Sequence, residues 1–186
     1  VRGWLGRVVR DVPDGDRVGV VVAHVDPGSP AEKAGVKRGD MIAKIRDEGV
    51  ASHHDFSERL RGVTVGELVS MVVIRGGAFV PLTVTAGRFP TTRARDFVKR
   101  RLGFSVRAVP RDAERAVGGV VILGLVRGGV AQRVGLRPGD RILQVANTPI
   151  GGLSDFDAAV ARAVGAKSVL MLIQRGRLGY YVTLPL

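Results

Sequence analysis

The chain contains two closely similar stretches one hundred residues apart, GVKRGDMI at residues 35–42 and GLRPGDRI at residues 135–142. The match extends in both directions without a gap, and residues 19–84 share 16 identities with residues 119–184 over 66 aligned pairs. Self-similarity at a fixed offset is the sequence signature of repeated structural units. We therefore predict two homologous domains, residues 1–87 and residues 102–186, joined by a basic linker over residues 88–101.

Both copies show the same order of predicted elements. Short runs of β-branched or alternating apolar residues predict strands, and glycine-bearing turns separate them. Two short helices are predicted in each copy, the second of which begins near Asp55 or Asp155. This pattern predicts an α+β fold class, mainly β, in which each domain is a partly open β-barrel or sandwich flanked by two short helices. The predicted strands are 7–10, 18–25, 41–45, 68–75 and 79–86 in the first copy, and 104–108, 120–126, 141–145, 168–174 and 178–184 in the second.

Composition and charge narrow the class of protein. The chain has 186 residues, of which 45% are hydrophobic and 25% charged, as in a folded globular protein. Its longest uncharged apolar runs are far shorter than the ~20 residues of a membrane-spanning helix, so we expect no transmembrane segment. The net charge of +12 is uneven, because residues 93–186 carry 16 Lys and Arg against 6 Asp and Glu. We interpret this excess as a solvated basic face in preference to a specific anion site.

A search for catalytic and cofactor motifs finds none. Cysteine is absent, and the three histidines lie in no HExxH spacing, so we expect no metal. No serine lies in a Gly-x-Ser-x-Gly elbow, and the glycine patterns that cradle phosphates are missing. Asp40 and Asp140 each open a strand after a glycine, which is typical of a residue that braces a turn. With 5% aromatic residues the chain lacks a stacking platform for nucleic acid, so we expect no nucleic acid partner, no cofactor and no enzymatic activity.

A Leu-Gly pair precedes the first strand of each copy. Glycine allows successive backbone N–H groups to converge on a carboxylate, and the strand that follows can pair with an added peptide strand. The last side chain of that peptide then enters a pocket between the strand and the second helix. The candidate peptide-binding residues are Leu5, Gly6, Arg7, Val8, Val9, Phe56, Arg59 and Leu60 in the first copy, and Leu102, Gly103, Phe104, Ser105, Val106, Phe156, Ala159 and Val160 in the second.

The two predicted pockets differ at one wall. Phe104 stands where the first copy has Arg7, so a peptide with an apolar end is expected to prefer the second domain. Alternatively, the Arg7 side chain extends outward and favours an acidic side chain near the peptide end. A third interpretation is that neither groove is open, because residues 111–117 or the linker lie across one of them.

These motifs resemble a known family. Leu102-Gly103-Phe104 resembles the carboxylate-binding loop of PDZ domains, and residues 28–42 resemble the most specific stretch of bacterial PDZ domains. Residues 2–6, followed by a tandem second copy, are similar to the C-terminal regulatory half of HtrA/Deg serine proteases. The resemblance implies a non-catalytic region that binds extended or C-terminal peptide segments and unfolded proteins. It also implies a bacterial periplasmic or cell-envelope location and contacts with neighbouring subunits and with a protease domain that this chain lacks. Arg7 departs from the family pattern.

Two other functions stay open at the level of the sequence. The chain could be a structural module whose basic second domain docks onto a neighbouring subunit or an anionic surface, and salt would weaken such docking steeply. It could also be the PDZ pair of an intramembrane zinc protease.

Overall fold

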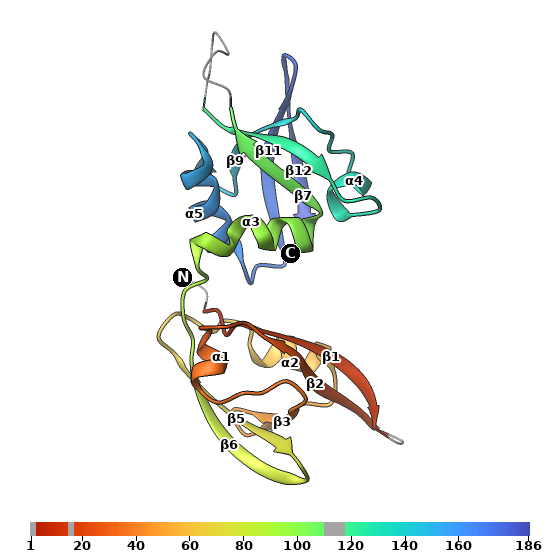
Figure 1. The fold of residues 1–186 in the computed structure, drawn as a ribbon, viewed down its shortest axis with the longest axis vertical. Coiled ribbons are helices and arrows are strands. Elements are labelled where there is room, and N and C mark those ends of the chain that lie inside the picture. The colour runs from red at the N-terminus through yellow and green to blue at the C-terminus, as the bar shows by residue number, and fades with distance from the viewer. Residues whose placement is uncertain (1–2, 15–16, 110–117) are drawn as a thin grey trace. The chain divides into compact units, whose positions relative to one another are not determined.

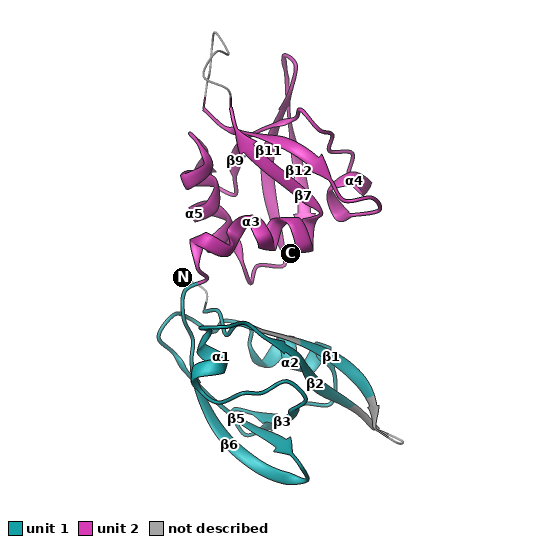
Figure 2. Cartoon of the chain, viewed as in Figure 1, with its two compact units in different colours: residues 1–88 teal, residues 89–186 magenta. Residues whose placement is uncertain are grey.

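The computed structural model of the protein describes residues 3–14, 17–109 and 118–186. The chain divides into two compact units, Val1–Arg88 and Phe89–Leu186, which Figure 2 shows in different colours. Each unit has its own hydrophobic core, centred on Val20, Ile42 and Val73 in the first and on Val120, Ile142 and Ile173 in the second. These core residues are related by the offset of one hundred that the sequence predicted.

The first unit is one antiparallel sheet with two short helices (Figure 1). The strand order is β1-β2-β3-β5-β6, and the short β4 pairs with β3. Because β1 and β6 each have one unpaired edge in this order, the sheet does not close into a barrel. Its elements are β1 (Arg7–Asp14), β2 (Arg17–Val25), α1 (Pro30–Lys33), β3 (Met41–Ile45), β4 (Glu48–Gly49), α2 (His53–Arg59), β5 (Leu68–Arg75) and β6 (Ala78–Thr85).

The second unit repeats this topology. Its strand order is β12-β11-β9-β8-β7, with β10 paired to β9, which is the first sheet read from the other edge. The predicted fold class is therefore confirmed, and each predicted strand coincides with an observed one. Its elements are β7 (Phe104–Ala108), β8 (Val120–Leu125), α4 (Val130–Arg133), β9 (Arg141–Val145), β10 (Thr148–Pro149), α5 (Leu153–Ala163), β11 (Ser168–Arg175) and β12 (Leu178–Pro185).

Alternation along the strands explains why each sheet has one buried face. In β5, Val69, Met71 and Val73 are buried, whereas Leu68 and Ser70, which alternate with them, are exposed. Successive side chains of a strand point to opposite faces, so this pattern places one face against the core. The equivalent strand β11 has the same burial pattern, which fixes the same register in the second unit.

The helix starts differ between the units. Pro30 opens α1 after Ser29, whose hydroxyl accepts the Glu32 N–H at 3.2 Å. In the second unit Gly129 stands at the position of Ser29, and α4 has no side-chain cap. A side-chain cap satisfies a backbone donor that the first turn leaves without a partner, so the first unit holds this turn more firmly.

The segment expected as a linker contains a helix that belongs to the second unit. A 3₁₀ turn (Thr91–Arg93), α3 (Ala94–Phe97) and a π-helical turn (Val98–Leu102) follow one another directly. Ala94, Val98 and Leu102 recur every four residues on one face and are buried in the second core, and Figure 1 shows α3 beside α5. Only residues 88–90 of the expected linker precede this helix. Among the described residues, no helix combines the length and the apolar character needed to cross a membrane.

Candidate functional site

The strands that follow the Leu-Gly pairs are edge strands. Within the described residues, β1 pairs only with β2, and β7 pairs only with β8. Both pairings have a register shift at the same place, between Val8 and Val9 in β1 and between Ser105 and Val106 in β7. An edge strand presents a row of backbone N–H and C=O groups along its outer side. Both strands therefore have the free edge that peptide addition requires.

The Leu-Gly loops have the same backbone conformation. Gly6 has φ +78° and Gly103 has φ +79°, a left-handed conformation that favours glycine. The carbonyl oxygen of Gly6 accepts the Asp26 N–H at 2.7 Å, and that of Gly103 accepts the Val126 N–H at 2.8 Å. These hydrogen bonds hold each loop against the turn that follows β2 or β8.

The space around the two glycines is unequal. A Cβ atom on Gly6 would lie 2.1 Å from the Cβ of Ser29, a severe overlap. A Cβ atom on Gly103 would lie 3.1 Å from the Cα of Gly129, which is tight but far less so. The first loop therefore requires glycine for space as well as for φ.

The donors of the two loops also differ. The Gly103 N–H donates to the carbonyl oxygen of Val98 at 2.9 Å and closes the last turn of the 91–102 helix. Within the described part of the chain, no hydrogen bond takes up the Gly6 N–H. Carbonyl groups at a helix C-terminus also carry partial negative charge, which disfavours a carboxylate there. The first loop is thus better equipped than the second to bind an anion.

In the second unit, the candidate pocket residues lie mostly inside the core. Phe104 and Phe156 are both 0% exposed, and their rings meet edge to face with centroids 6.5 Å apart. This contact brings together the start of β7 and the first turns of α5. Leu102, Gly103, Ala159 and Val160 are also buried, whereas Ser105 and Val106 are half-buried.

In the first unit, the structure brings together only part of the predicted set. Leu5, Val9 and Phe56 are buried in the core, and Leu60 packs against it. Arg59 forms an ion pair with Glu48 beside β4, so its guanidinium is engaged there. The side chains of Arg7 and Val8 lie outside the described part of the structure, as do residues 111–117, for which the sequence allowed a position across a groove.

Sequence reasoning missed one residue of this region. The carboxylate of Asp11, in β1, accepts the backbone N–H of His53, the first residue of α2, at 2.6 Å. The predicted strand ended at Arg10, one residue too early to include it. Aspartate is depleted in strands, so an aspartate directly after a predicted strand could have indicated a side chain with a specific hydrogen-bond partner.

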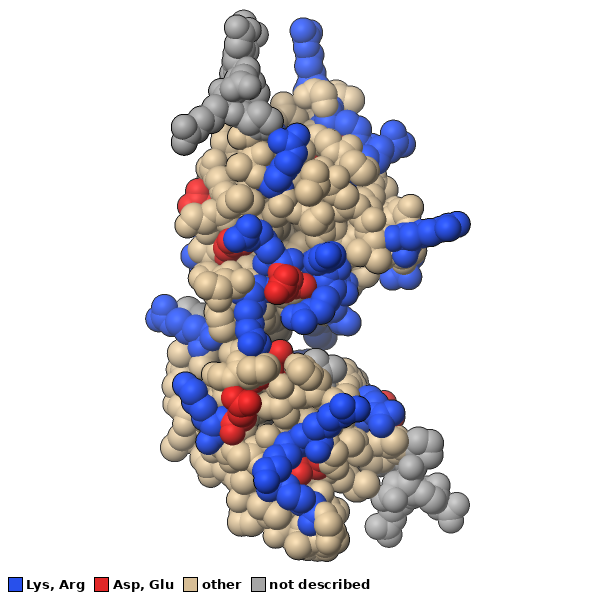
Figure 3. Space-filling view, viewed as in Figure 1, with Lys and Arg blue, Asp and Glu red and all other residues tan. Residues whose placement is uncertain are grey.

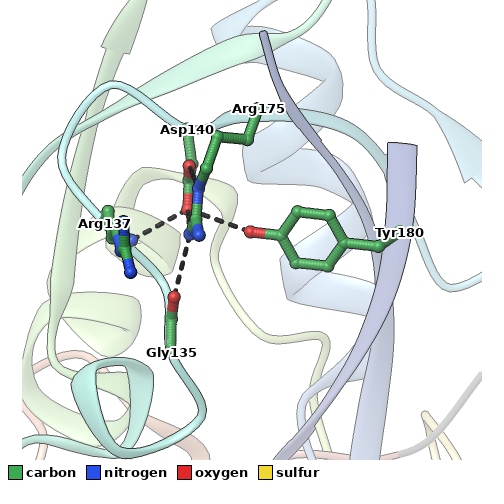
Figure 4. Close-up of polar contacts among 5 residues, drawn as sticks. All are labelled: Gly135, Arg137, Asp140, Arg175 and Tyr180. Carbon is green, nitrogen blue, oxygen red and sulfur yellow. Dashed lines mark hydrogen bonds and ion pairs between the residues drawn. The ribbon is translucent and has the colours of Figure 1, made fainter. Parts of the chain in front are cut away.

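Asp40 and Asp140 brace the turns in which they lie. Each accepts two hydrogen bonds of 2.7 Å from an arginine of the following hairpin, Arg75 or Arg175. Figure 4 shows the second brace, in which Arg175 also donates to the Gly135 carbonyl and the Tyr180 hydroxyl donates to Asp140. Burial favours a higher pKa for Asp140, but these hydrogen bonds outweigh it and hold the pKa below its ordinary value.

The pKa of Asp40 is lowered in the same way, with its burial outweighed by hydrogen bonds from Arg75 and from the Lys37 N–H. The two carboxylates are thus ionised and fully engaged in structural contacts. Among the described residues, no three His, Asp or Glu side chains gather in a way that could hold a metal ion.

Basic side chains cluster on the second unit. On the face that Figure 3 shows, Lys and Arg gather around the region of the 91–102 helix, with few acidic groups among them. Lys99, Arg100 and Arg101 are exposed on the last turn of that helix. Arg95 faces α5 instead and pairs with Asp157 at 3.3 Å.

Comparison with known families agrees with this architecture. A family model of the PDZ domain matches residues 3–85, and a second PDZ-domain model matches residues 121–175. The chain is a tandem pair of PDZ domains and belongs to the PDZ domain family.

The relatives of the chain have the names of bacterial proteases. The chain is 29% identical over 206 residues to the "Probable periplasmic serine endoprotease DegP-like" of Ectopseudomonas mendocina (strain ymp), and 30% identical over 205 residues to that of Pseudomonas putida (strain GB-1). Both alignments cover 100% of this chain and 43% of the relative, so the chain spans less than half the length of these proteases. The resemblance to the tandem PDZ region of HtrA/Deg-type proteases is confirmed.

Solved structures of HtrA proteins are also similar. The structure titled "HtrA-type protease AlgW with decapeptide" is 31% identical, covers 46% of this chain and 29% of its own, and has a TM-score of 0.43. The HtrA3 PDZ domain bound to a phage-derived ligand is 19% identical, with 46% and 85% coverage and a TM-score of 0.40.

Proposed function

We propose that this chain is the non-catalytic, peptide-binding regulatory region of an HtrA-like serine protease. The observation that carries the proposal is that β1 and β7 are edge strands, each directly preceded by a left-handed glycine loop. Strand addition to such an edge satisfies the backbone groups of both partners, and the loop receives the peptide carboxylate. The ligands are extended or C-terminal segments of peptides and unfolded proteins.

Of the two domains, the first is the stronger carboxylate binder. Among the described residues no hydrogen bond takes up the Gly6 N–H, whereas the Gly103 N–H already donates to the Val98 carbonyl, and this difference supports the first domain. The predicted preference of apolar peptides for the second domain rested on Phe104 as a pocket wall. That ring is fully buried against Phe156, so the advantage requires the core to open.

The protein acts in the periplasm or cell envelope of a bacterium, as the names of its relatives suggest. There the PDZ pair contacts its own protease domain and neighbouring subunits, and peptide binding regulates proteolysis of misfolded proteins. The chemistry resides in the protease part, since the residues of this chain form a binding region.

Amide chemical shifts of the full chain test the proposal. A peptide with a free C-terminal carboxylate is expected to shift the Gly6 amide resonance in a ¹H–¹⁵N spectrum at concentrations about tenfold lower than the Gly103 resonance. The same peptide with an amidated C-terminus serves as the control and should lose most of the effect at Gly6. Equal responses to the two peptides, or changes confined to β6 and β12, would contradict the proposal.

A second function is supported by the exposed cations Lys99, Arg100 and Arg101 on one helical turn. The apolar face of this helix is buried and its cations face solvent, where Arg101 also donates to the Leu186 carbonyl at 3.1 Å. Sedimentation with vesicles containing phosphatidylglycerol at 50 and 300 mM salt tests this docking function. Binding that is lost at high salt and by replacing all three cations with glutamine would support it.

A further inference from the structure

A long-range hydrogen bond joins the two walls of the candidate groove in the first domain. We use the word clasp for the bond of 2.6 Å from the His53 N–H to the Asp11 carboxylate. Val9, two residues earlier in β1, is buried in the core. Side chains two residues apart lie on the same face of a strand, so Asp11 is on the face of β1 that turns toward α2.

The clasp adds to a helix start that already has local partners. The Ser52 hydroxyl accepts the Asp55 N–H at 3.1 Å, and the Asp55 carboxylate accepts the Ala51 N–H at 3.1 Å. Asp11 therefore supplies an additional, long-range contact, 42 residues away from His53 in the sequence.

Among the described residues of the second domain, no hydrogen bond equivalent to the clasp is found. Aligned from the Leu-Gly pairs, Ala108 occupies the position of Asp11, and a methyl group cannot accept a hydrogen bond. Its helix α5 keeps the local contact, in which Asp155 accepts the Gly151 N–H at 2.9 Å. The two domains thus share this aspartate contact, whereas α5 has Gly152 in place of the Ser52 cap and Ala108 in place of Asp11.

The position of the clasp sets a distance along the groove. A peptide whose carboxylate lies at the Gly6 loop must run antiparallel to β1, since the loop precedes the strand. Asp11 is four residues beyond Arg7, which corresponds to about 13 Å along the strand, or about four peptide residues. At that point β1 and α2 are bonded to each other, and a peptide side chain cannot pass between them.

We infer that Asp11 is a specificity-determining residue that limits the first domain to about the last four residues of a C-terminal peptide. This inference rests on the proposed peptide-binding function. Residues further upstream in the peptide leave the groove and add little affinity. The second domain, with Ala108, has no such limit.

A length series of peptides tests the inference on the full chain. The probes have four, six or eight residues, share their last four, carry a free carboxylate and have threonine at the upstream positions. Trp4 is the only tryptophan, and its Cζ2 would lie 3.0 Å from a Cβ on Gly6, so its emission reports the first loop. In the unmodified protein, the Kd is expected to stay constant within about twofold across the series.

Variants locate the limit at the clasp. In Asp11→Ala, which carries the residue of the second domain, the octapeptide should bind about threefold or more tighter than the tetrapeptide. Asp11→Asn keeps an acceptor oxygen and should behave as the unmodified protein. Ala108→Asp makes the reverse change in the second domain and should leave the Trp4 titrations unchanged.

Several results would overturn the inference. One is a Kd of the unmodified protein that falls threefold or more from four to eight residues, a result that needs no variant and no assumption about folding. Another is an Asp11→Ala variant whose affinity changes by the same factor for all three lengths. A length series altered by Ala108→Asp would also overturn it, because the limit would then lie outside the first domain. If no peptide changes Trp4 emission in a saturable way, the proposed function itself fails.

Discussion

The two Leu-Gly loops have the same shape but are preceded by different structures. Before Gly6, Trp4 forms an antiparallel bridge with Gly87, whereas before Gly103 the chain is a helix that ends by taking up the Gly103 N–H. The φ angles of the two glycines differ by only one degree. The comparison teaches that two loops can have the same backbone conformation while the residues before them decide whether the glycine N–H already donates a hydrogen bond within the chain.

The braces around Asp40 and Asp140 show the opposite behaviour. Their arginine hydrogen bonds have the same lengths, and the second brace only adds Tyr180. Contacts that hold the scaffold have thus stayed alike in the two domains, while the loop that would meet a ligand has diverged.

The largest difference between the loops is expected from Gly6→Ala and Gly103→Ala. In the first, the left-handed φ and the overlap with Ser29 together cost about 2 to 4 kcal/mol of the free energy of unfolding. In the second, the conformational cost dominates, at about 1 to 2 kcal/mol. Urea unfolding followed by Trp4 emission for the first domain and by amide resonances for both measures the two losses. Equal losses would show that the space around the glycines does not matter.

Replacing the aspartate of either brace should lower the stability of the two domains to a similar extent, and the loss should depend on pH. Asp40→Asn or Asp140→Asn leaves an arginine without its carboxylate and is expected to lower the melting temperature of the affected domain by about 5 to 10 °C at pH 7. Because the folded pKa of each aspartate is below the ordinary 3.8, its contribution is present above that pH and is lost as the pH falls through the folded pKa.

Melting curves between pH 7 and pH 2 check this sign. The unmodified protein and the two variants should converge at the acid end of the range. A difference between them that grows below pH 3.8 would contradict the role of the ionised carboxylates.

The helix caps give a smaller and asymmetric effect. Ser29→Ala removes the hydroxyl that accepts the Glu32 N–H and should cost the first domain about 1 kcal/mol. The reverse change, Gly129→Ser, should not stabilise the second domain, because its Cβ would lie 2.9 Å from the Val126 carbonyl oxygen. Chemical unfolding of both variants measures this, and a gain of stability in Gly129→Ser would show that the second loop has room to relax.

Tyr180→Phe is expected to have the smallest effect. It removes the long hydrogen bond of 3.3 Å to Asp140 and keeps the aromatic ring, which lies 5.4 Å from the Arg175 guanidinium carbon. The loss in the free energy of unfolding should be about 0.5 kcal/mol. The first domain has Val80 at the matching position, so its brace works without a tyrosine. A larger loss in Tyr180→Phe than in Asp140→Asn would therefore mean that the two braces are not equivalent.

Much of the fold followed from the sequence, because the repeat and the two-residue alternation fix the strands and their order. The bracing role expected for Asp40 and Asp140 also agrees with the structure. The segment that forms the 91–102 helix was predicted as a basic linker, because cations separate Ala94, Val98 and Leu102 and obscure their four-residue spacing.

The site was less predictable. Whether the Phe104 ring points into a groove or into the core depends on how closely α5 packs, which no local pattern encodes. The bond between Asp11 and His53 joins positions 42 residues apart and depends on the tertiary fold.

The bridge between Trp4 and Gly87 has a mechanical consequence. The Trp4 N–H donates to the Gly87 carbonyl at 2.7 Å and the Gly87 N–H donates back at 2.9 Å, so the chain enters and leaves the first domain at neighbouring points. Tension along the polypeptide is therefore carried by these two bonds and by the neighbouring bond of 2.8 Å from the Gly3 N–H to the Val63 carbonyl, and most of the sheet stays out of the line of force. A pull on the two ends of the first domain is therefore expected to break the hydrogen bonds between Trp4 and Gly87 before it disturbs the core of the domain.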